Sequence, residues 1–310
     1  MRPIVPLLLL ALAVPAAAQQ GRAPFTIQET GQGFQTIDDA VQSVRMGTAT
    51  ILIAPGVYHQ CTIQAGGVIT FKAIQPGTAI FEGTTCEDKA AFVLRGQGST
   101  VDGLVFRGMR VGDGNGAGIR TEIGDLVVRN SMFLDSQEGI LGGHPSAQKI
   151  TIDRSTFAGL GQCDESPSCS HSIYLANQGS VTITNSRFER GTGGHYVKLR
   201  VPRVTIADNS FDDTKGRKTN YMIDLPEGGT GLITRNTFVQ GAGKENHSGL
   251  IVVSAEAKTY RATGLRIEGN DATLAPNAPT NPAFVANMSG DQLAVGANRL
   301  GPGIRMYEVR

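Results

Sequence analysis

Short segments in which apolar and polar residues alternate recur along most of the chain, and many of them lead to a phenylalanine. The phenylalanines that end "GLVF", "NSMF", "RSTF", "NSRF", "DNSF" and "RNTF" are Phe106, Phe133, Phe157, Phe188, Phe211 and Phe238. The steps between them are 27, 24, 31, 23 and 27 residues. A repeat of about 20–50 residues is the sequence signature of a repeat architecture.

Each repeat predicts at least two short strands. One precedes the phenylalanine, as in "ITID" and "VTIT", and one follows it after a turn, as in "HSIYLA" and "HYVKLR". Two positions before each of the last five phenylalanines lies a small polar residue: Ser131, Ser155, Ser186, Asn209 and Asn236. Stacked in parallel, coils of roughly 22–30 residues form a solenoid in which equivalent side chains contact one another, and such polar residues can form a ladder.

The N-terminal end predicts a cap for this stack. In "GFQTIDDAVQSV", Ile37, Ala40, Val41 and Val44 have helical spacing and Thr36 is a suitable N-cap, so we expect a helix at about residues 34–45. A helix there would cover the otherwise unpaired strand edge. From about residue 264 the pattern is less regular, with a Pro- and Asn-rich excursion over residues 273–284.

Taken together, "TIDDAV", "ILIAPGVY" and the Phe and Asn ladders resemble the pectin-lyase-like right-handed parallel β-helix superfamily over about residues 33–300. The resemblance implies an all-β fold, a single-stranded right-handed parallel β-helix (solenoid) with an N-terminal capping helix, in one domain over residues 19–310. It also implies that Cys61 and Cys86, 25 residues apart, lie one coil above the other, where they can form a disulfide. Because fold alone does not give function, the activity must be argued from the site.

The first eighteen residues predict a secretory signal peptide. Arg2 is followed by an apolar run over residues 4–14 and by small residues, and we expect cleavage after Ala18 and export to the periplasm or the medium. No later stretch is apolar enough to span a membrane. Glycine is abundant (40) and charged residues are sparse (18%), a composition that favours many short strands over a helical bundle.

Charge and cysteine content narrow the function further. Without Arg2 the chain has 27 basic (28 − 1) and 27 acidic residues, whereas a nucleic-acid-binding protein usually has a basic excess. We therefore expect no nucleic-acid partner and only a local site for anions. We also expect a monomer. The four cysteines fit an oxidising compartment: Cys163 and Cys169 bracket a short loop and predict a local disulfide, although free buried thiols are the alternative. A zinc site is disfavoured because CxxC pairs are lacking.

Alignment of the strands that follow the phenylalanines predicts one outward-facing stripe. The inward column is Ile119, Ile140, Ile173, Val197, Ile223 and Ile251, and the outward column is Arg120, Leu141, Tyr174, Lys198, Asp224 and Val252. His171, His195 and Tyr221 share a column at the strand entrance. Because neighbouring coils are about 4.8 Å apart, residues far apart in sequence would lie within reach of one sugar unit.

This stripe contains the candidate catalytic residues: Lys198, Arg200, His171, His195, Tyr174 and Asp224. Two cations on one face can bind a carboxylate, histidine exchanges protons near neutral pH, and tyrosine can protonate a leaving oxygen. Each also has a plain structural interpretation, such as a salt bridge between Lys198 and Asp224 or histidines that bind backbone groups. Candidate substrate-binding residues are Arg120, Glu122, Tyr196 and Tyr221, with a surface pair as the alternative for Arg120 and Glu122.

No cofactor or metal site is identified. The adjacent acids of "FDDT" (residues 211–214) and "CDES" could bind calcium, but two acids in a turn are weak evidence for a calcium site. The resemblance favours an exported polysaccharide lyase, since many members of the superfamily are polysaccharide lyases. Such an enzyme cleaves a uronate polymer by β-elimination, which needs a cation, a base and an acid. Here Arg200 would bind the carboxylate, Lys198 or His195 would be the base, and Tyr174 or His171 the acid.

Three alternatives remain. A C5-epimerase would use similar groups without cleaving the chain, and a non-catalytic carbohydrate-binding or surface-structural protein would use the same face for recognition. A glycoside hydrolase is disfavoured because Asp224 and Glu122 are poorly placed as a carboxylate pair. The sequence also lacks the acidic calcium cluster of the superfamily's pectate lyases.

Overall fold

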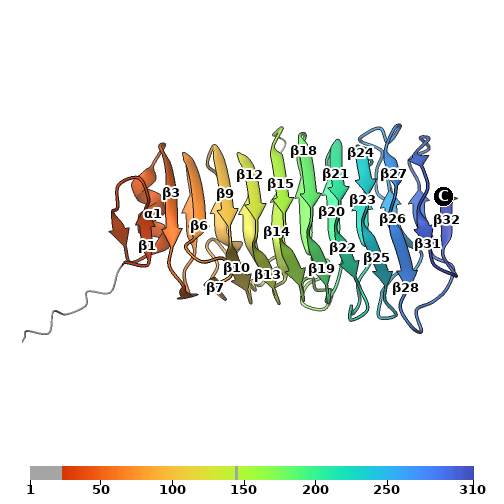
Figure 1. Cartoon of the computed structure of the whole chain (residues 1–310), viewed down its shortest axis with the longest axis horizontal. Helices are drawn as coiled ribbons and strands as arrows, with labels where there is room; N and C mark the ends of the chain where they lie inside the picture. Colours follow the sequence, from red (N-terminus) through yellow and green to blue (C-terminus); the bar gives the residue numbers. More distant parts are fainter. Residues whose placement is uncertain (1–22, 144–145) are drawn as a thin grey trace, which may run out of the picture.

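The computed structural model describes residues 23–143 and 146–310, so the predicted signal peptide lies outside the described residues. The strands form three long sheets that run the length of the molecule (Figure 1). Successive strands of the chain enter the three sheets in turn, and every neighbouring pair from β3 onward is parallel. The predicted all-β parallel solenoid is therefore confirmed.

The first sheet includes two short antiparallel strands at its N-terminal edge. Its strands, in spatial order, are β2 (Gly33–Phe34), β1 (Phe25–Ile27), β3 (Thr48–Ile53), β6 (Val68–Ala73), β9 (Gly98–Asp102), β12 (Asp125–Arg129), β15 (Lys149–Asp153), β18 (Ser180–Thr184), β21 (Arg203–Ala207), β24 (Thr230–Thr234), β27 (Arg266–Glu268) and β30 (Ala294–Val295).

The second sheet contains the phenylalanine strands. They are β4 (Gly56–Tyr58), β7 (Ala79–Glu82), β10 (Leu104–Arg107), β13 (Met132–Leu134), β16 (Thr156–Ala158), β19 (Arg187–Glu189), β22 (Ser210–Asp212), β25 (Thr237–Gln240), β28 (Asp271–Leu274) and β31 (Arg299–Leu300). Several have only three residues, too few for alternation to reveal them as separate strands, which is why the sequence predicted at least two strands per coil and did not resolve the third.

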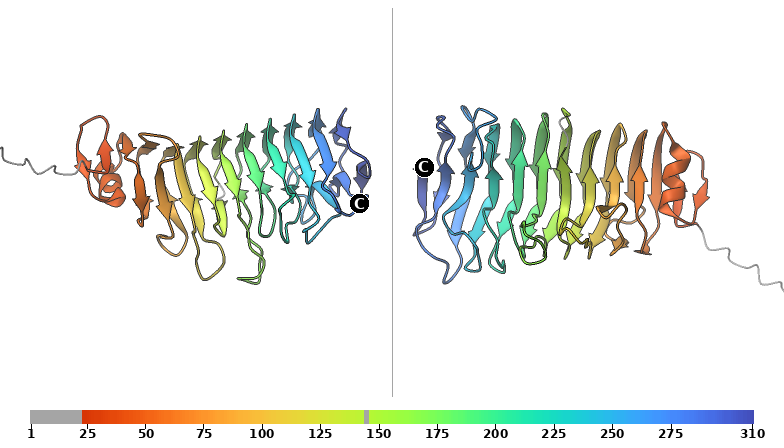
Figure 2. Two further views of the ribbon diagram at one scale, coloured as in Figure 1. Left: turned by 60° about the horizontal axis from the view of Figure 1, so that its bottom comes forward. Right: turned by 180° about the vertical axis from the view of Figure 1, so that it is seen from behind.

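The third sheet contains the strands of the predicted functional stripe. They are β5 (Thr62–Gln64), β8 (Ala90–Leu94), β11 (Ala117–Thr121), β14 (Glu138–Gly143), β17 (Ile173–Ala176), β20 (Val197–Arg200), β23 (Ile223–Leu225), β26 (Gly249–Val253), β29 (Ala283–Asn287) and β32 (Arg305–Val309). Long connections lead into these strands from the second sheet, and they extend from one side of the solenoid (lower side, left view of Figure 2).

The core is a continuous column of phenylalanine rings. Phe133, Phe157 and Phe188 stack at centroid distances of 4.9 Å with nearly parallel planes, and each is buried. The polar ladder also forms: the Ser155 Oγ accepts a hydrogen bond from the Ser131 amide (3.3 Å), and the Asn209 side chain donates to Asn236 (2.9 Å). Each coil therefore fixes the register of the next through apolar and polar contacts alike.

A short helix covers the N-terminal end, as predicted. Helix α1 (Ile37–Val44) packs on the first coil, and the Thr36 hydroxyl accepts a hydrogen bond from the Asp39 amide (3.1 Å), the bond expected of an N-cap. Both predicted disulfides are present: Cys61–Cys86 joins adjacent coils and Cys163–Cys169 closes a short loop. At the C-terminal end β30 and β31 have two residues each, in line with the weaker pattern there.

Candidate functional site

The outer face of the third sheet brings the predicted residues together. Ile173, Val197 and Ile223 pair in register and face the core. The residues that follow them, Tyr174, Lys198 and Asp224, pair in the same register and face outward. The predicted columns are thus confirmed, because the parallel pairing holds three consecutive coils without a shift.

Lys198, on β20, lies at the centre of this group. Its Nζ is 2.7 Å from Glu256 Oε1, 4.0 Å from Asp224 Oδ2 and 5.5 Å from the centre of the Tyr174 ring. The side chain is only 11% exposed, so its charge is held in a partly desolvated environment where these contacts are strengthened. We call Tyr174, Lys198, Arg200, Asp224 and Glu256 the Lys198 cluster.

Arg200, two positions further along β20, is fully engaged by other side chains. Its Nε donates to the Tyr174 hydroxyl (2.9 Å), one Nη donates to Glu227 Oε1 (2.7 Å) and the other contacts Glu256. Burial alone would lower the pKa of Arg200, but the hydrogen bonds to Glu256 and Glu227 outweigh it and raise the pKa. The predicted carboxylate clamp is therefore charged, and two carboxylates of the chain itself already occupy it.

Asp224, on β23, is a buried carboxyl with few partners. It is 2% exposed, its Oδ2 lies 3.4 Å from His195 Nε2, and its Oδ1 has no hydrogen-bond partner. Burial raises the pKa of Asp224 to about 7, and the nearby Lys198 ammonium offsets only part of this effect. A carboxyl that titrates near neutral pH beside a lysine is characteristic of functional sites.

The histidine column runs along the entrance of the same strands. The rings of His171 and His195 stack 5.0 Å apart, and Tyr221 continues the column at 5.3 Å. His171 Nδ1 accepts a hydrogen bond from the His195 amide (3.0 Å), and His195 Nδ1 accepts one from the Tyr221 amide (3.1 Å). Both rings are therefore neutral, with their proton on Nε2, and His195 directs that proton toward Asp224.

Burial keeps these histidines neutral at physiological pH. Desolvation, reinforced by the Lys198 charge, lowers the pKa of His171 to about 3. Desolvation, the neighbouring His171 and Lys198 hold the pKa of His195 well below its ordinary value. The role of proton donor predicted for His171 is thus disfavoured by its burial.

Tyr196 is a correction to the prediction. As a candidate substrate-binding residue it should lie on the outward face, but it is 1% exposed inside the solenoid, where its hydroxyl donates to Asp213 Oδ1 (2.8 Å). β20 begins only at Val197, so the alternation of inward and outward side chains does not extend to Tyr196. Tyr196 therefore cannot contact a substrate, whereas Tyr221 is half-buried at the edge of the same face.

Asp213 belongs to the "FDDT" segment, whose adjacent acids are only weak evidence for a calcium site. Its carboxylate is completely buried and is bound by Tyr196, the Thr219 hydroxyl (2.9 Å) and Lys244 Nζ (3.3 Å). These groups satisfy the carboxylate, so it has no role as an exposed calcium ligand. The network instead joins the loop before β23 to the loop before β26.

The side chains of Arg120 and Glu122 have different surroundings, although the two residues are only two positions apart in sequence. Arg120 occupies the predicted column on β11, beside Leu141, and its Nε is buried without a partner. Glu122 instead accepts hydrogen bonds from Arg95 (2.6 Å) and Lys89 (3.4 Å), so the surface pair considered for Arg120 and Glu122 is not formed. Their role as outer subsites stays a prediction.

Sequence reasoning missed three carboxylates of this face. Glu256 follows β26, Glu227 lies in the turn after β23, and Glu138 begins β14. Glu138 is 1% exposed, it accepts the His171 backbone N–H, and desolvation raises its pKa well above the ordinary value. Glu138 pairs with Ala117, and by the same register it lies one coil before His171. The alignment of strands could therefore have placed Glu138 in the histidine column.

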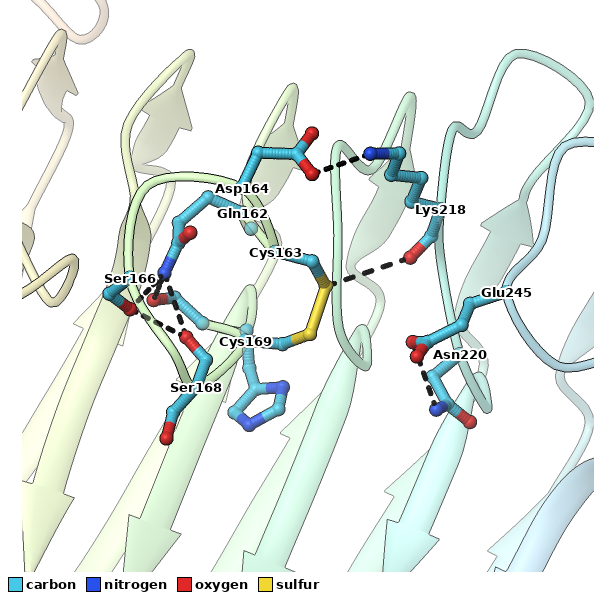
Figure 3. The surroundings of a disulfide bond; sticks show 12 residues. Gln162, Cys163, Asp164, Ser166, Ser168, Cys169, Lys218, Asn220 and Glu245 are labelled. Carbon is cyan, nitrogen blue, oxygen red and sulfur yellow. Dashed lines mark hydrogen bonds and ion pairs between the residues drawn. A yellow bond between two sulfur atoms is a disulfide. The ribbon is translucent and has the colours of Figure 1, made fainter.

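The loop closed by the second disulfide stands beside the strand entrances (Figure 3). The Gln162 amide donates to the Ser166 hydroxyl and the Ser168 carbonyl (both 2.9 Å), and Asp164 pairs with Lys218 of a neighbouring loop (2.5 Å). In the part of the chain that the structure describes, Cys163, Cys169 and Glu245 form the one group of metal-ligating residue types within reach of a common ion. Because both sulfurs are in the disulfide, this group offers no thiolate ligand.

An open pocket of about 280 Å³ adjoins the Lys198 cluster. It is lined by Gly143, Ala176, Asn177, Gln178, Arg200, Glu227 and Tyr260. This volume is near the lower limit of ligand pockets, about 300 Å³. Arg200 and Tyr260 place a charged guanidinium and an aromatic ring in the wall of this pocket.

The family assignment agrees with this geometry. Residues 90–287, more than half of the chain, match the family described as the right-handed beta helix region, so the chain belongs to that family. No curated protein matches the sequence. A solved structure, that of the Streptococcus pneumoniae surface protein and adhesin PfbA, is 10% identical, with a TM-score of 0.43 over 87% of this chain and 93% of that chain.

Two further findings concern the environment of the protein. No helix within residues 23–143 and 146–310 has the length and apolar character needed to cross a bilayer. The four cysteines form two disulfides, and disulfides of this kind are typical of an oxidising, extracytoplasmic compartment.

Proposed function

We propose that the protein is an exported lyase that cleaves a uronate-containing polysaccharide by β-elimination at the Lys198 cluster. The observation that supports this most strongly is the bridging of Lys198 and Arg200 by a single carboxylate, that of Glu256, next to a carboxyl that titrates near pH 7. The two cations therefore already bind the functional group that a uronate would present.

The roles follow from which atoms are free. In the productive complex Lys198 and Arg200 bind the substrate carboxylate and stabilise the negative charge that develops when the C5 proton leaves. Both His195 nitrogens are engaged, so the proton goes to Asp224, whose Oδ1 has no partner. Its pKa near 7 suits a general base at neutral pH.

Tyr174 serves as the acid. Its hydroxyl oxygen accepts a hydrogen bond from Arg200 Nε, which leaves the O–H free to donate to the departing glycosidic oxygen. The C5–H bond breaks toward Asp224, the electron pair forms the C4–C5 double bond, and the C4–O bond breaks as Tyr174 gives its proton. Tyr174 and Asp224 lie two strand spacings apart, about 10 Å at the backbone, on either side of Lys198.

The test is to incubate purified protein with polygalacturonate and alginate and to follow the ultraviolet absorbance of the unsaturated product. We expect Lys198→Ala to reduce the rate about 100-fold or more, as for loss of a preorganised charge, while polymer binding persists. Lys149→Ala, a change at an exposed lysine of β15, is the matched control and retains activity. The proposal fails if wild-type protein yields no unsaturated product on any uronate polymer.

A non-catalytic carbohydrate-binding protein is the second candidate. It is favoured by the engagement of Arg200 with Tyr174, Glu227 and Glu256, and by the use of both histidine Nδ1 atoms to bind backbone amides. Binding of the polymers without any product would identify this function. Exchange of the C5 hydrogen with solvent at constant chain length would instead identify an epimerase.

A further inference from the structure

The connection between β26 and β27 differs from the other connections that leave the third sheet. It spans residues 254–265, twelve residues, whereas the others span two to six by the strand bounds. A solenoid coil closes with two residues at this corner, as it does after β20, so the added length is not needed for the fold. We call residues 254–265 the lid loop.

The lid loop folds back over the preceding coil. The Glu256 and Ala257 amides donate to the Pro226 carbonyl (3.0 and 2.9 Å), and the Tyr260 amide donates to the Glu227 carbonyl (2.9 Å). The Tyr260 hydroxyl reaches the Asn177 carbonyl (3.4 Å), which is three coils back along the third sheet. The loop therefore crosses one edge of the Lys198 cluster and forms a wall of the pocket beside Arg200.

The ends of the lid loop are anchored separately from its middle. The Ala262 amide donates to Asp291 Oδ2 (2.7 Å) of the next coil, and Ser254 continues directly from β26. Ser254 and Gly264 both have positive φ (59° and 85°), so the chain turns sharply at each end. The intervening residues 255–259 are exposed. They are held by backbone hydrogen bonds to the turn after β23 and by the ion pairs of Glu256.

Glu256 connects this loop to the cations. One carboxylate oxygen lies 2.7 Å from Lys198 Nζ and the other contacts Arg200, in a bidentate bridge. The Glu256 side chain is 43% exposed while those of Lys198 and Arg200 are 11% and 20% exposed, so the carboxylate covers the cations from the solvent side. A ligand that approaches from solvent meets Glu256 first.

We infer that Glu256 is an internal stand-in for the carboxylate of the ligand, and that the lid loop must be displaced before the Lys198 cluster can bind a uronate. This deepens the proposed function and rests on it. A carboxylate that enters from the exposed Glu256 side offers Lys198 and Arg200 the same charge pairing that Glu256 gives up, so it can replace Glu256 without leaving either cation unpaired. A neutral sugar has no such group and leaves Lys198 and Arg200 paired with Glu256. The lid thus selects ligands that carry a carboxylate.

The experiment compares Glu256→Gln with Glu268→Gln, a change to another partly exposed glutamate that pairs with an arginine, on β27. The probes are trigalacturonate and its methyl ester, which has the same sugar rings without the charge. We expect Glu256→Gln to bind trigalacturonate about tenfold more tightly if the lid is closed nine-tenths of the time, because the competing carboxylate is gone. Glu268→Gln should bind it as wild type does.

Hydrogen exchange supplies a second readout that needs no variant. Trigalacturonate should accelerate exchange of the Glu256, Ala257 and Tyr260 amides in wild-type protein, and the methyl ester should not. If wild type binds or cleaves the charged probe but Glu256→Gln has unchanged or weaker affinity, the lid inference is overturned and the proposed function stands. If no variant binds the charged probe, both are overturned.

Discussion

Replacement of Asp224 by asparagine should change how the stability of the protein depends on pH. The Asp224 carboxyl is 2% exposed and has one unpartnered oxygen, so burial favours its neutral form in the folded state. Asparagine has nearly the same shape and no charge, and its Oδ1 can accept the hydrogen that His195 Nε2 directs toward this side chain. The substitution therefore removes the titration while it preserves the packing.

The magnitude follows from the two pKa values. The pKa of Asp224 is about 7 in the folded protein against an ordinary value of 3.8, a difference of about three pH units. At 1.36 kcal/mol per unit this amounts to roughly 4 kcal/mol. Between these pKa values the folded state holds a proton that the unfolded state has lost, so the free energy of unfolding falls as pH rises.

The contribution of the protonated Asp224 is therefore fully present below about pH 4 and is lost by the time the pH exceeds about 7. The histidines act in the opposite sense. Because His171 has a pKa of about 3 when folded against 6.5 ordinarily, its contribution is present above about pH 6.5 and is lost as the pH falls toward 3. Only the difference between the wild type and Asp224→Asn isolates the carboxyl.

The assay is chemical denaturation of both proteins at pH 4.5, 6 and 8. The first two values lie between the unfolded-state and folded-state pKa of Asp224, and pH 8 lies above both. The stability of Asp224→Asn relative to wild type should increase steadily over this range, by a few kcal/mol in total. Asp88→Asn is the control, because Asp88 is exposed and asparagine tolerates its positive φ. Parallel stability curves for wild type and Asp224→Asn would refute the burial argument.

Two further predictions concern the groups that position the site. Phe157→Ala should lower the free energy of unfolding by about 3–5 kcal/mol, because it opens a cavity in the phenylalanine column between the rings of Phe133 and Phe188. A loss below about 1 kcal/mol would contradict the view that this column is the main part of the core. Lys244→Met should cost about 3–5 kcal/mol because it leaves the Asp213 carboxylate buried without its cation. The stability of both variants is measured by chemical denaturation, and Lys149→Met, at an exposed lysine, is the control for Lys244→Met. A Lys244→Met protein as stable as wild type would show that the Lys244–Asp213 ion pair is dispensable.

The sequence predicted those parts of the site that depend on strand register. Tyr174, Lys198 and Asp224 could be placed in one column because each follows an inward-facing aliphatic residue in a coil of similar length. His171, His195 and Tyr221 followed from the same alignment. In a parallel stack the register of one pair fixes all its neighbours, so a one-dimensional pattern becomes a contact list.

The errors lie where the chain leaves regular strand geometry. Tyr196 precedes β20 and lies in the core. The strand alternation, extended back beyond the start of β20, wrongly placed its side chain on the outside. Glu227 and Glu256 lie in connections, which have no period from which their position could be read. Glu138 was within the aligned column, but an isolated acid at a strand entrance gives no sign that it is buried.

By itself the sequence determined the stacked architecture, its N-terminal cap and the composition of the stripe, because all of these depend on local periodicity or on coil length. The pairing of Cys61 with Cys86 followed only with the help of the family resemblance, and the structure decided that all four cysteines are in disulfides. Only the tertiary structure decided which side chains are ionised, which are buried and which are already paired. These properties depend on the distance and exposure of groups from separate coils and loops. The occupation of Lys198 and Arg200 by Glu256, which lies 58 and 56 residues away from them in sequence, is the clearest case, since the path of a loop follows from no repeating pattern.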